Sequence, residues 1–383
     1  MLTSNIGFKN FNLKKNSNKI KSNLKIFFKE NNQILKSLGK DYKNSFDKSS
    51  ISKYKKNNNF RIIGMGGSIL GTRSIYDFLK HKIKKNFDFV DNINPYLNTH
   101  KEKNYVNIIV SKSGNTLETI SNVNILIKKD KNIFITENRK SYLYLLAKKL
   151  KAEIVHHNNF IGGRYSVLSE VGMLPAELMG LSVVKFKQLN NLIKNKKFIN
   201  SLIINVNNTL FFLKQKKFNS IILNYDESSD SLFKWYQQLI AESLGKKGKG
   251  IMPIISTMPK DNHSVMQLYL DGPKNNFFTF FHVKEEKSGK INNSKILPSF
   301  SHLRNKNLEK IVLSQKLATE KVFLNRNMPF RSFEIIKRNE QTLGELFCFF
   351  ILETILLGRA LKIDPYNQPS VELIKKETKK ILI

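Results

Sequence analysis

Short apolar runs alternate with amphipathic stretches along most of this chain. Such alternation is typical of a parallel sheet that is covered by helices on both faces. Between the runs, apolar residues recur at helical spacing, as at Leu117, Ile120, Val123 and Ile127. In the first half we predict strands at residues 60–65, 105–110, 132–136 and 153–157. This half of the chain therefore predicts an α/β domain.

A second alternation of the same kind follows a lysine-rich segment at residues 181–216, which we predict to be helical. Residues 284–298 are rich in Lys, Ser and Asn and predict a surface loop. With 383 residues, the chain is long enough for two domains, which we place at residues 1–190, with an N-terminal helical extension, and 191–383. Further strands are expected at residues 220–225, 251–256 and 277–283, followed by C-terminal helices.

The longest apolar run, at residues 346–357, predicts a core helix. It is interrupted by Glu353 and Thr354 and is shorter than the roughly 20 residues that a membrane span requires. No association with a membrane is expected. The single cysteine, Cys348, lies in this run, so we expect a buried thiol and a reducing, cytoplasmic location. The N-terminus lacks a secretory signal, and a lysine-rich targeting peptide is the less favoured alternative to a packed helix.

The formal net charge of +35 raises the question of a nucleic-acid partner. The lysines are spread over the whole chain and accompany many Asn, Ile and Phe residues, which indicates a compositional bias. We find no zinc-ligand spacing, no helix-turn-helix signature and no aromatic RNA-binding strand, so no specific nucleic-acid partner is expected. The charge would still raise the local concentration of anionic substrates.

Residues 111–116 read Ser-Lys-Ser-Gly-Asn-Thr and connect a predicted strand to a predicted helix. Backbone N–H groups of the first helical turn, three hydroxyls and one ammonium converge there at the positive end of the helix dipole. Such an arrangement suits a phosphate dianion. An ordinary turn with a helix cap uses the same residue types, so both interpretations stay open at this point.

A second turn after a predicted strand contains Gly64, Gly66, Gly67 and Ser68. The glycines allow the backbone to approach a ligand closely, although the spacing is not that of a dinucleotide-binding fingerprint. A tight turn without a ligand is the alternative. Two such turns would lie side by side at the carboxyl edge of one sheet, where open α/β sheets bind ligands.

Charged groups occur in two further motifs. Arg164 follows a glycine pair and is expected at the sheet edge, where it could bind a carboxylate or stabilise an enolate, although a structural ion pair is nearly as common a use. In the predicted helix around residues 230–244, Gln238 and Glu242 lie four residues apart on one face. The other face carries Leu232, Tyr236, Leu239 and Ser243.

Two weaker signals lie further along the chain. His263 follows a predicted strand and offers an imidazole that titrates near neutrality, yet most single histidines are structural. Near the C-terminus, a turn bounded by Pro365 and Pro369 leads into a helix, with Gln368 before its start and Lys375 two turns in.

In their order and wording these motifs resemble the glucose-6-phosphate isomerase family. The resemblance extends from about residue 60 to residue 376. It implies an α/β fold of two flavodoxin-like sugar-isomerase domains, each a parallel sheet between helix layers, and a homodimer whose active site is completed across the interface. The segments that carry it are GMGGSILG, SKSGNTLET, GGRYSVLSEVGMLP, QQLIAESLGKKG and NQPSVELIKK.

Roles follow by motif from this resemblance. Glu242 would move a proton between C2 and C1 of a sugar phosphate, Arg164 would stabilise the cis-enediolate, and Lys375 and a partner subunit's histidine, His263, would open the sugar ring. No metal or redox cofactor is implied. The substrate-binding residues would be Ser68, Ser111, Lys112, Ser113, Thr116, Gln238 and Gln368.

The chain departs from the family pattern at three places. The phosphate loop reads Ser-Gly-Asn-Thr at residues 113–116, where many members have bulkier residues, and this wording also occurs in bifunctional phosphoglucose/phosphomannose isomerases. Asp261 and Asn262 replace the usual Gly-Gln before the histidine, and Pro369 and Ser370 replace the common Trp-Gly after Gln368. A bifunctional phosphoglucose/phosphomannose isomerase and a noncatalytic regulator that binds sugar phosphates are the alternatives to the isomerase. A regulator would need only the phosphate loops.

Overall fold

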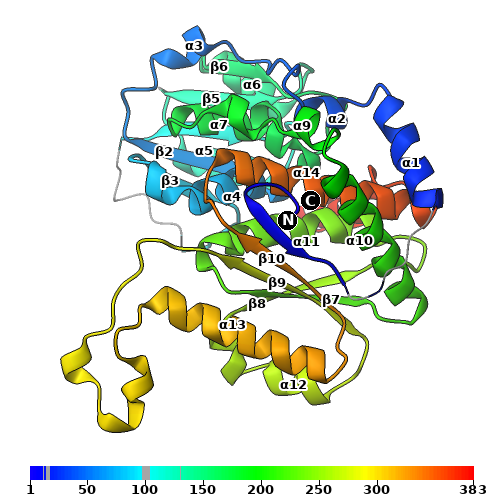
Figure 1. The fold of residues 1–383 in the computed structure, drawn as a ribbon. Coiled ribbons are helices and arrows are strands. Elements are labelled where there is room, and N and C mark those ends of the chain that lie inside the picture. Colours follow the sequence, from blue (N-terminus) through cyan, green and yellow to red (C-terminus); the bar gives the residue numbers. More distant parts are fainter. Residues whose placement is uncertain (12, 14–17, 97–103, 130) are drawn as a thin grey trace.

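Two five-stranded sheets form the centre of the molecule (Figure 1). The structure is a computed structural model and describes residues 1–11, 13, 18–96, 104–129 and 131–383. The first sheet has the order β3-β2-β4-β5-β6, and all its neighbouring strands run parallel. Its strands are β2 (Asn59–Gly64), β3 (Asn86–Val90), β4 (Val106–Val110), β5 (Asn132–Thr136) and β6 (Glu153–His156).

Both faces of the first sheet are covered, which explains its nearly continuous apolar strands. Ile63 and Ile109 pack into a cluster with Val123 and Leu143, from the helices on one face. The neighbouring residues in these strands point the other way, into the main core of the molecule. The α-helices between residues 48 and 178 are α3 (Lys48–Ser52), α4 (Leu70–Phe78), α5 (Leu117–Leu126), α6 (Tyr142–Lys149) and α7 (Glu170–Leu178).

The second sheet has the order β1-β10-β9-β7-β8, and it is parallel except for its first pair. β1, from the N-terminal segment, pairs antiparallel with β10. The expected division of the chain near residue 190 stays a prediction, but these N-terminal residues join the sheet of the second half. The strands are β1 (Ile6–Lys9), β7 (Asn219–Asn224), β8 (Met252–Thr257), β9 (Asn276–Val283) and β10 (Phe330–Ile335).

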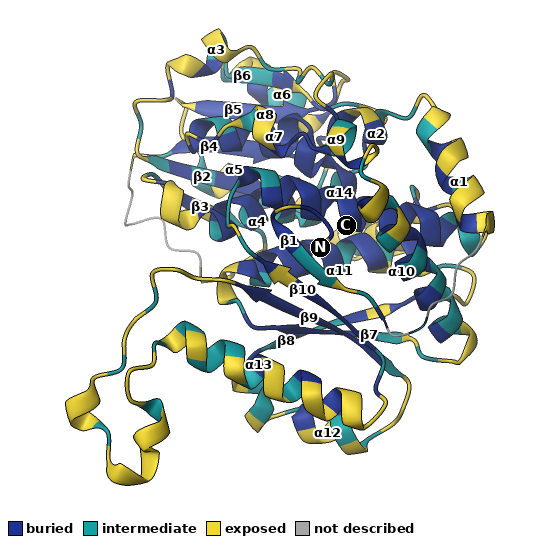
Figure 2. Ribbon diagram, in the orientation of Figure 1, coloured by how far each residue is buried: buried dark blue, intermediate teal, exposed yellow. Residues whose placement is uncertain are grey.

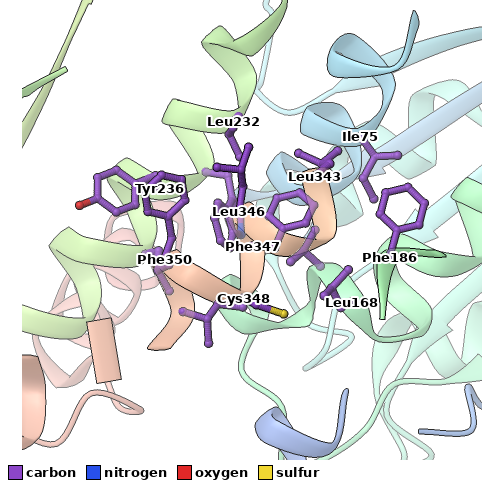
Figure 3. Close-up of a cluster of buried hydrophobic side chains, with 14 of the residues drawn as sticks. Ile75, Leu168, Phe186, Leu232, Tyr236, Leu343, Leu346, Phe347, Cys348 and Phe350 are labelled. Atoms are coloured by element: carbon purple, nitrogen blue, oxygen red, sulfur yellow. The ribbon is translucent and has the colours of Figure 1, made fainter. Parts of the chain in front are cut away.

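One hydrophobic core joins the two halves. α14 (Glu340–Ala360) runs through it, and its Phe347 and Phe350 lie among side chains of α4 and α11 (Asp230–Leu244) (Figure 3). Cys348 is fully buried in the same cluster, as predicted.

On the far face of the second sheet lie α12 (Met266–Asp271) and α13 (Leu308–Asn325), whose outer sides are exposed (Figure 2). In the described part of the chain, no helix is both long and apolar enough to cross a membrane.

Seven predicted strands are confirmed to within one or two residues, but β1, β3 and β10 were not predicted. The lysine-rich segment at residues 181–216 is not one helix. It forms α8 (Val183–Phe186), α9 (Leu189–Leu192) and α10 (Lys196–Lys214). The N-terminal helical segment is confirmed as α1 (Asn18–Lys29) and α2 (Gln33–Leu38), and residues 284–298 are mostly exposed and without long elements, as predicted.

Candidate active site

The turns after β2 and β6 meet at the carboxyl edge of the first sheet. They form the short helices η1 (Gly66–Ser68) and η3 (Gly163–Leu168). A Cβ on Gly67 would lie 2.2 Å from the carbonyl carbon of Gly163, so only glycine permits this approach. Gly66 has a φ of +52°, and a Cβ there would lie 2.7 Å from Nε2 of Gln238 on α11. The glycine-rich turn therefore brings the arginine motif and α11 together.

The loop after β4 presents its hydroxyls beside the start of α5. Ser111 Oγ and Thr116 Oγ1 lie 2.9 Å apart, and Ser113 Oγ accepts a hydrogen bond from the Asn115 N–H at 3.2 Å. Thr116 is the N-cap residue of α5, yet its side chain makes no capping hydrogen bond. An ordinary cap therefore does not account for this hydroxyl, and the first-turn N–H groups of α5 lie beside it.

Lys112 is held by neighbouring loops. Its Nζ donates to the Asn159 carbonyl oxygen at 2.7 Å and lies 3.7 Å from Oε1 of Glu137. Burial lowers the pKa of the Lys112 ammonium, and the Glu137 carboxylate partly opposes this shift. The ammonium thus sits at the same sheet edge as the hydroxyl loop, already paired with protein oxygens.

Arg164 is the most densely bonded side chain of the site. It is buried, with 3% of the residue exposed, and each of its five N–H hydrogens has an acceptor. Nε donates to Ser243 Oγ at 2.8 Å, and Nη1 donates to Glu242 Oε2 at 3.1 Å and to Gln368 Oε1 at 2.8 Å. Nη2 donates to the carbonyl oxygens of Pro365 and Asn367 at 2.7 and 3.1 Å. The guanidinium group therefore fixes α11 to the loop before the C-terminal helix.

Glu242 lies between Arg164 and Gln238. Its Oε1 accepts a hydrogen bond from Gln238 Nε2 at 2.9 Å, from one turn earlier in α11. The Glu242 side chain is 30% exposed, against 2% for Arg164, so the carboxylate faces the open side of the pair. Among the described residues, Gln238 Oε1 is one of the buried side-chain oxygens that has no hydrogen-bond partner.

The structure thus links four of the predicted site residues by hydrogen bonds: Arg164, Gln238, Glu242 and Gln368. Gln368 is the N-cap residue of α15 (Pro369–Leu382), and Pro369 occupies the first helical turn, where proline is tolerated. Ser68 ends η1 and is half-buried at the same edge.

Seven predicted residues make no hydrogen bond to this group among the described contacts. Five lie in the turn after β2 and the loop after β4: Ser68, Ser111, Lys112, Ser113 and Thr116. The other two are His263 and Lys375. His263 is exposed in η5 (Lys260–His263), after β8 of the second sheet. Lys375 is exposed on α15 and pairs with Glu372 of its own helix at 2.7 Å. No hydrogen bond or ion pair between described residues joins either of them to Glu242.

Sequence reasoning missed two polar residues that contact the arginine. Ser243 and Tyr165 are fully buried, and their hydroxyl oxygens lie 2.9 Å apart. A signal for Ser243 was present, because it is a hydroxyl on the otherwise apolar face of α11. No comparable signal marked Tyr165, since a buried tyrosine is common in any core.

Known proteins with the same sequence features point to one family. A family profile described as Phosphoglucose isomerase matches residues 12–257, more than half of the chain. Glucose-6-phosphate isomerase of Methanocaldococcus jannaschii is 33% identical over 355 residues, which cover 85% of this chain and 86% of that protein. The chain belongs to the phosphoglucose isomerase family. Glucose-6-phosphate isomerase of Mycoplasmopsis pulmonis is 31% identical over 386 residues, covering 90% of this chain and 89% of that one.

Solved structures share the fold. A hypothetical protein of Thermus thermophilus superposes with a TM-score of 0.80 at 21% identity, over 95% of this chain and 94% of that one. A glucose-6-phosphate isomerase of Chlamydia trachomatis gives a TM-score of 0.71 at 17% identity, over 91% and 77% of the two chains. The predicted α/β architecture of helix-covered parallel sheets is confirmed.

The match to the phosphoglucose isomerase profile covers the members of the hydrogen-bonded group that precede residue 258. It includes Arg164, Gln238, Glu242 and the loop at residues 111–116, and it ends before His263, Gln368 and Lys375.

Proposed function

We propose that this member of the phosphoglucose isomerase family interconverts glucose 6-phosphate and fructose 6-phosphate. The proposal depends above all on the hydrogen-bonded pair of Glu242 and Arg164, which sets a carboxylate beside a fixed cation. Relatives of matching length carry the name glucose-6-phosphate isomerase. An aldose–ketose isomerisation requires a base that removes and returns one proton, a cation beside the developing negative charge and a grip on the remote phosphate.

Glu242 is the base in this proposal. It takes the proton from C2 of the open-chain aldose and returns it to C1, so that no net proton is gained or lost. A carboxylate has about four acceptor positions, and the hydrogen bonds from Gln238 and Arg164 occupy one on each oxygen. A lone pair on each oxygen is left to receive the proton. The partial exposure of the side chain leaves room for a substrate on that side.

Arg164 stabilises the cis-enediolate. Removal of the C2 proton places one negative charge on the oxygen at C1, and this charge passes to the oxygen at C2 when the O2 hydroxyl proton moves to O1. A guanidinium fixed before the reaction does not have to reorganise when that charge appears. The five hydrogen bonds of Arg164 supply this fixation. Gln238 and Gln368 flank the pair and are assigned to the hydroxyl groups of the sugar.

The phosphate group binds at the loop after β4 in this assignment. Its oxygens accept hydrogen bonds from the hydroxyls of Ser68, Ser111, Ser113 and Thr116 and from the first-turn N–H groups of α5, and Lys112 adds a positive charge. Binding energy from this remote group orients the reacting carbons. The uncapped hydroxyl of Thr116 supports the assignment.

Ring opening is assigned to His263 and Lys375. Both side chains are exposed, which leaves them available to a substrate bound at an interface between subunits. We therefore propose a homodimer in which His263 of the partner subunit completes each site. The buried thiol of Cys348 fits a reducing compartment, and we place the enzyme in the cytoplasm.

The test is to incubate the purified protein with fructose 6-phosphate and to follow the sugar phosphates by NMR. Glucose 6-phosphate is the expected product. Mannose 6-phosphate in the same sample would indicate the bifunctional alternative. Binding of fructose 6-phosphate without any turnover would contradict the proposal and favour a regulator.

A further inference from the structure

A closed ring of buried hydrogen bonds surrounds the guanidinium group of Arg164. Arg164 Nε donates to Ser243 Oγ at 2.8 Å, the Ser243 and Tyr165 oxygens lie 2.9 Å apart, and Tyr165 Oη donates to the Pro365 carbonyl oxygen at 3.0 Å. The same carbonyl accepts a hydrogen bond from Arg164 Nη2 at 2.7 Å, which closes the ring. Ser243 and Tyr165 are both fully buried, so neither can contact a substrate without a large rearrangement.

The direction of the hydrogen bonds in this ring follows from the proton count. A hydroxyl has one proton, and that of Tyr165 is directed at Pro365. The contact of 2.9 Å between the two hydroxyl oxygens therefore uses the Ser243 proton, while Ser243 Oγ accepts from Arg164. Burial raises the pKa of Tyr165 to about 12, so its hydroxyl stays a donor at neutral pH.

The ring determines how the guanidinium plane lies against α11. Arg164 bridges two consecutive residues of that helix, with Nε at Ser243 on the buried side and Nη1 at Glu242 on the open side. A planar guanidinium group cannot satisfy both contacts if it rotates about its own axis. The contact with Ser243 therefore helps to set the position of Nη1 beside the carboxylate, together with the hydrogen bonds from Nη2 to the carbonyl oxygens of Pro365 and Asn367.

We infer that Ser243 and Tyr165 are positioning residues, which hold the guanidinium group of Arg164 in the orientation that serves proton transfer by Glu242. This inference rests on the proposed isomerase function. Ser243 acts through Arg164 and not on the sugar. Its removal should lower kcat more than it raises KM, because a small displacement of a catalytic group can cost roughly 100-fold in rate.

The test compares Ser243→Ala with Ser231→Ala, which removes another buried hydroxyl of α11 that is bonded to Asp77 and not to the ring. Wild-type protein is expected to convert fructose 6-phosphate. Ser243→Ala should lower kcat by about 10-fold to 100-fold with KM changed less than about 3-fold. Ser231→Ala should keep the wild-type kcat.

A double variant separates positioning from simple structural support. Lysine cannot bridge Ser243 and Glu242, so in an Arg164→Lys background the change Ser243→Ala should lower kcat no further than about 2-fold. If Ser243→Ala does not fold, Tyr165→Phe keeps the ring volume and removes the hydroxyl that contacts Ser243 and Pro365. This variant should also lower kcat more than it raises KM.

The outcomes are distinct. A wild-type protein that turns over while Ser243→Ala or Tyr165→Phe keeps the full kcat would overturn the positioning role alone. Fully additive losses in the double variant would also overturn it. A wild-type protein that never converts fructose 6-phosphate would overturn the proposed function and the positioning role with it.

Discussion

Among single residues, the hydroxyl group of Thr116 has a position that an ordinary helix cap does not explain. Thr116 occupies an N-cap position without capping α5, and its hydroxyl instead contacts Ser111. The Thr116 hydroxyl thus lies beside the first-turn N–H groups of α5 without capping them, which agrees with the proposed phosphate site. A sugar phosphate would bring three charged acceptor oxygens to this place.

Removing both hydroxyls with Ser111→Ala and Thr116→Val should raise KM for fructose 6-phosphate and also lower kcat, since phosphate binding energy positions a remote carbon. Each lost hydrogen bond to the charged phosphate should cost about 1.5–3 kcal/mol. Steady-state kinetics measure both constants. Ser121→Ala is the control, because the hydroxyl of this half-buried residue donates to the Leu117 carbonyl oxygen of the same helix. Equal kinetics for the double variant and the control would mean that the loop binds something else.

At the scale of elements, the contact of η1 with η3 determines where Arg164 lies. A Cβ on Gly67 would collide with the backbone of Gly163 and Arg164 at 2.2 and 2.3 Å, and backbone cannot move aside as a flexible side chain can. The glycine of this turn is therefore required by packing between two turns of the site.

Gly67→Ala is expected to lower the free energy of unfolding by roughly 1–3 kcal/mol, the usual cost of overpacking, and to reduce kcat because η3 carries Arg164. Gly162→Ala is the matched control, since a Cβ there would have only Tyr165 Cδ2 nearby, at 3.9 Å. In urea unfolding, Gly67→Ala should have a lower free energy of unfolding than Gly162→Ala, and its kcat should also be lower. If Gly67→Ala and Gly162→Ala behave alike, the close approach of the two turns is not as described.

A buried lysine connects two other elements. Lys187 donates to the carbonyl oxygens of Ser37 in α2 and Leu168 in η3, and it is 3% exposed. Burial lowers its pKa to about 7, although Glu170 and Cys348 oppose the shift. A neutral amine still has two N–H donors for the two carbonyls.

This shift makes a prediction about pH. Between about pH 7 and pH 10 the unfolded chain carries a proton on Lys187 and the folded chain does not, so stability gained from this group rises with pH. The slope should reach about 1.4 kcal/mol per pH unit. Urea unfolding of the wild type and of Lys187→Met across this range should show that the difference between their free energies of unfolding changes with pH, because only the wild type gains stability from this group as the pH rises. Parallel curves for the two proteins would show that Lys187 titrates normally.

The strands missed by sequence analysis show the limit of local pattern. β10 was not predicted because it contains Arg331, a charged residue that is unusual in a buried strand. The partners that compensate the buried charge are distant in sequence: Arg331 Nη1 donates to Glu353 of α14 at 2.5 Å and to Asn205 of α10 at 2.8 Å. β3 is an edge strand with exposed polar positions, and β1 has four residues whose pairing partner is β10. Strands buried on both faces of the first sheet were predictable because their burial is continuous.

The site was predictable in part because some of its residues lie in short, recognisable motifs. Glu242, Gln238 and Arg164 stand in compact motifs, and hydrogen bonds join them in the structure. The support around Arg164 comes from backbone carbonyls of Pro365 and Asn367, whose direction no local sequence pattern reveals.

At the scale of the whole molecule, the two sheets share one core, and α11 is part of it. In the proposed dimer, each active site contains residues of both subunits. His263 lies after β8 and is not part of the hydrogen-bonded group around Arg164, so we assign it to the site of the partner subunit. Complementation between two inactive proteins tests this arrangement.

Mixing Glu242→Gln with His263→Ala should restore activity, because one of the two sites in a mixed dimer would have both groups. Activity is measured after subunit exchange, and native mass spectrometry reports whether mixed dimers have formed. Mixed dimers that form and stay inactive would mean that His263 acts within its own subunit or not at all.

The proposed isomerisation depends most on proton transfer by Glu242. Glu242→Gln keeps the shape of the side chain and its contact with Arg164, while Gln238 can turn its amide to accommodate the change. The most direct measurement is kcat for fructose 6-phosphate together with the Kd of the same sugar, with the exposed Glu227→Gln as control. We expect kcat of Glu242→Gln to fall by about 10²–10⁴-fold at nearly constant Kd. Retention of more than about a tenth of the wild-type kcat would contradict the account.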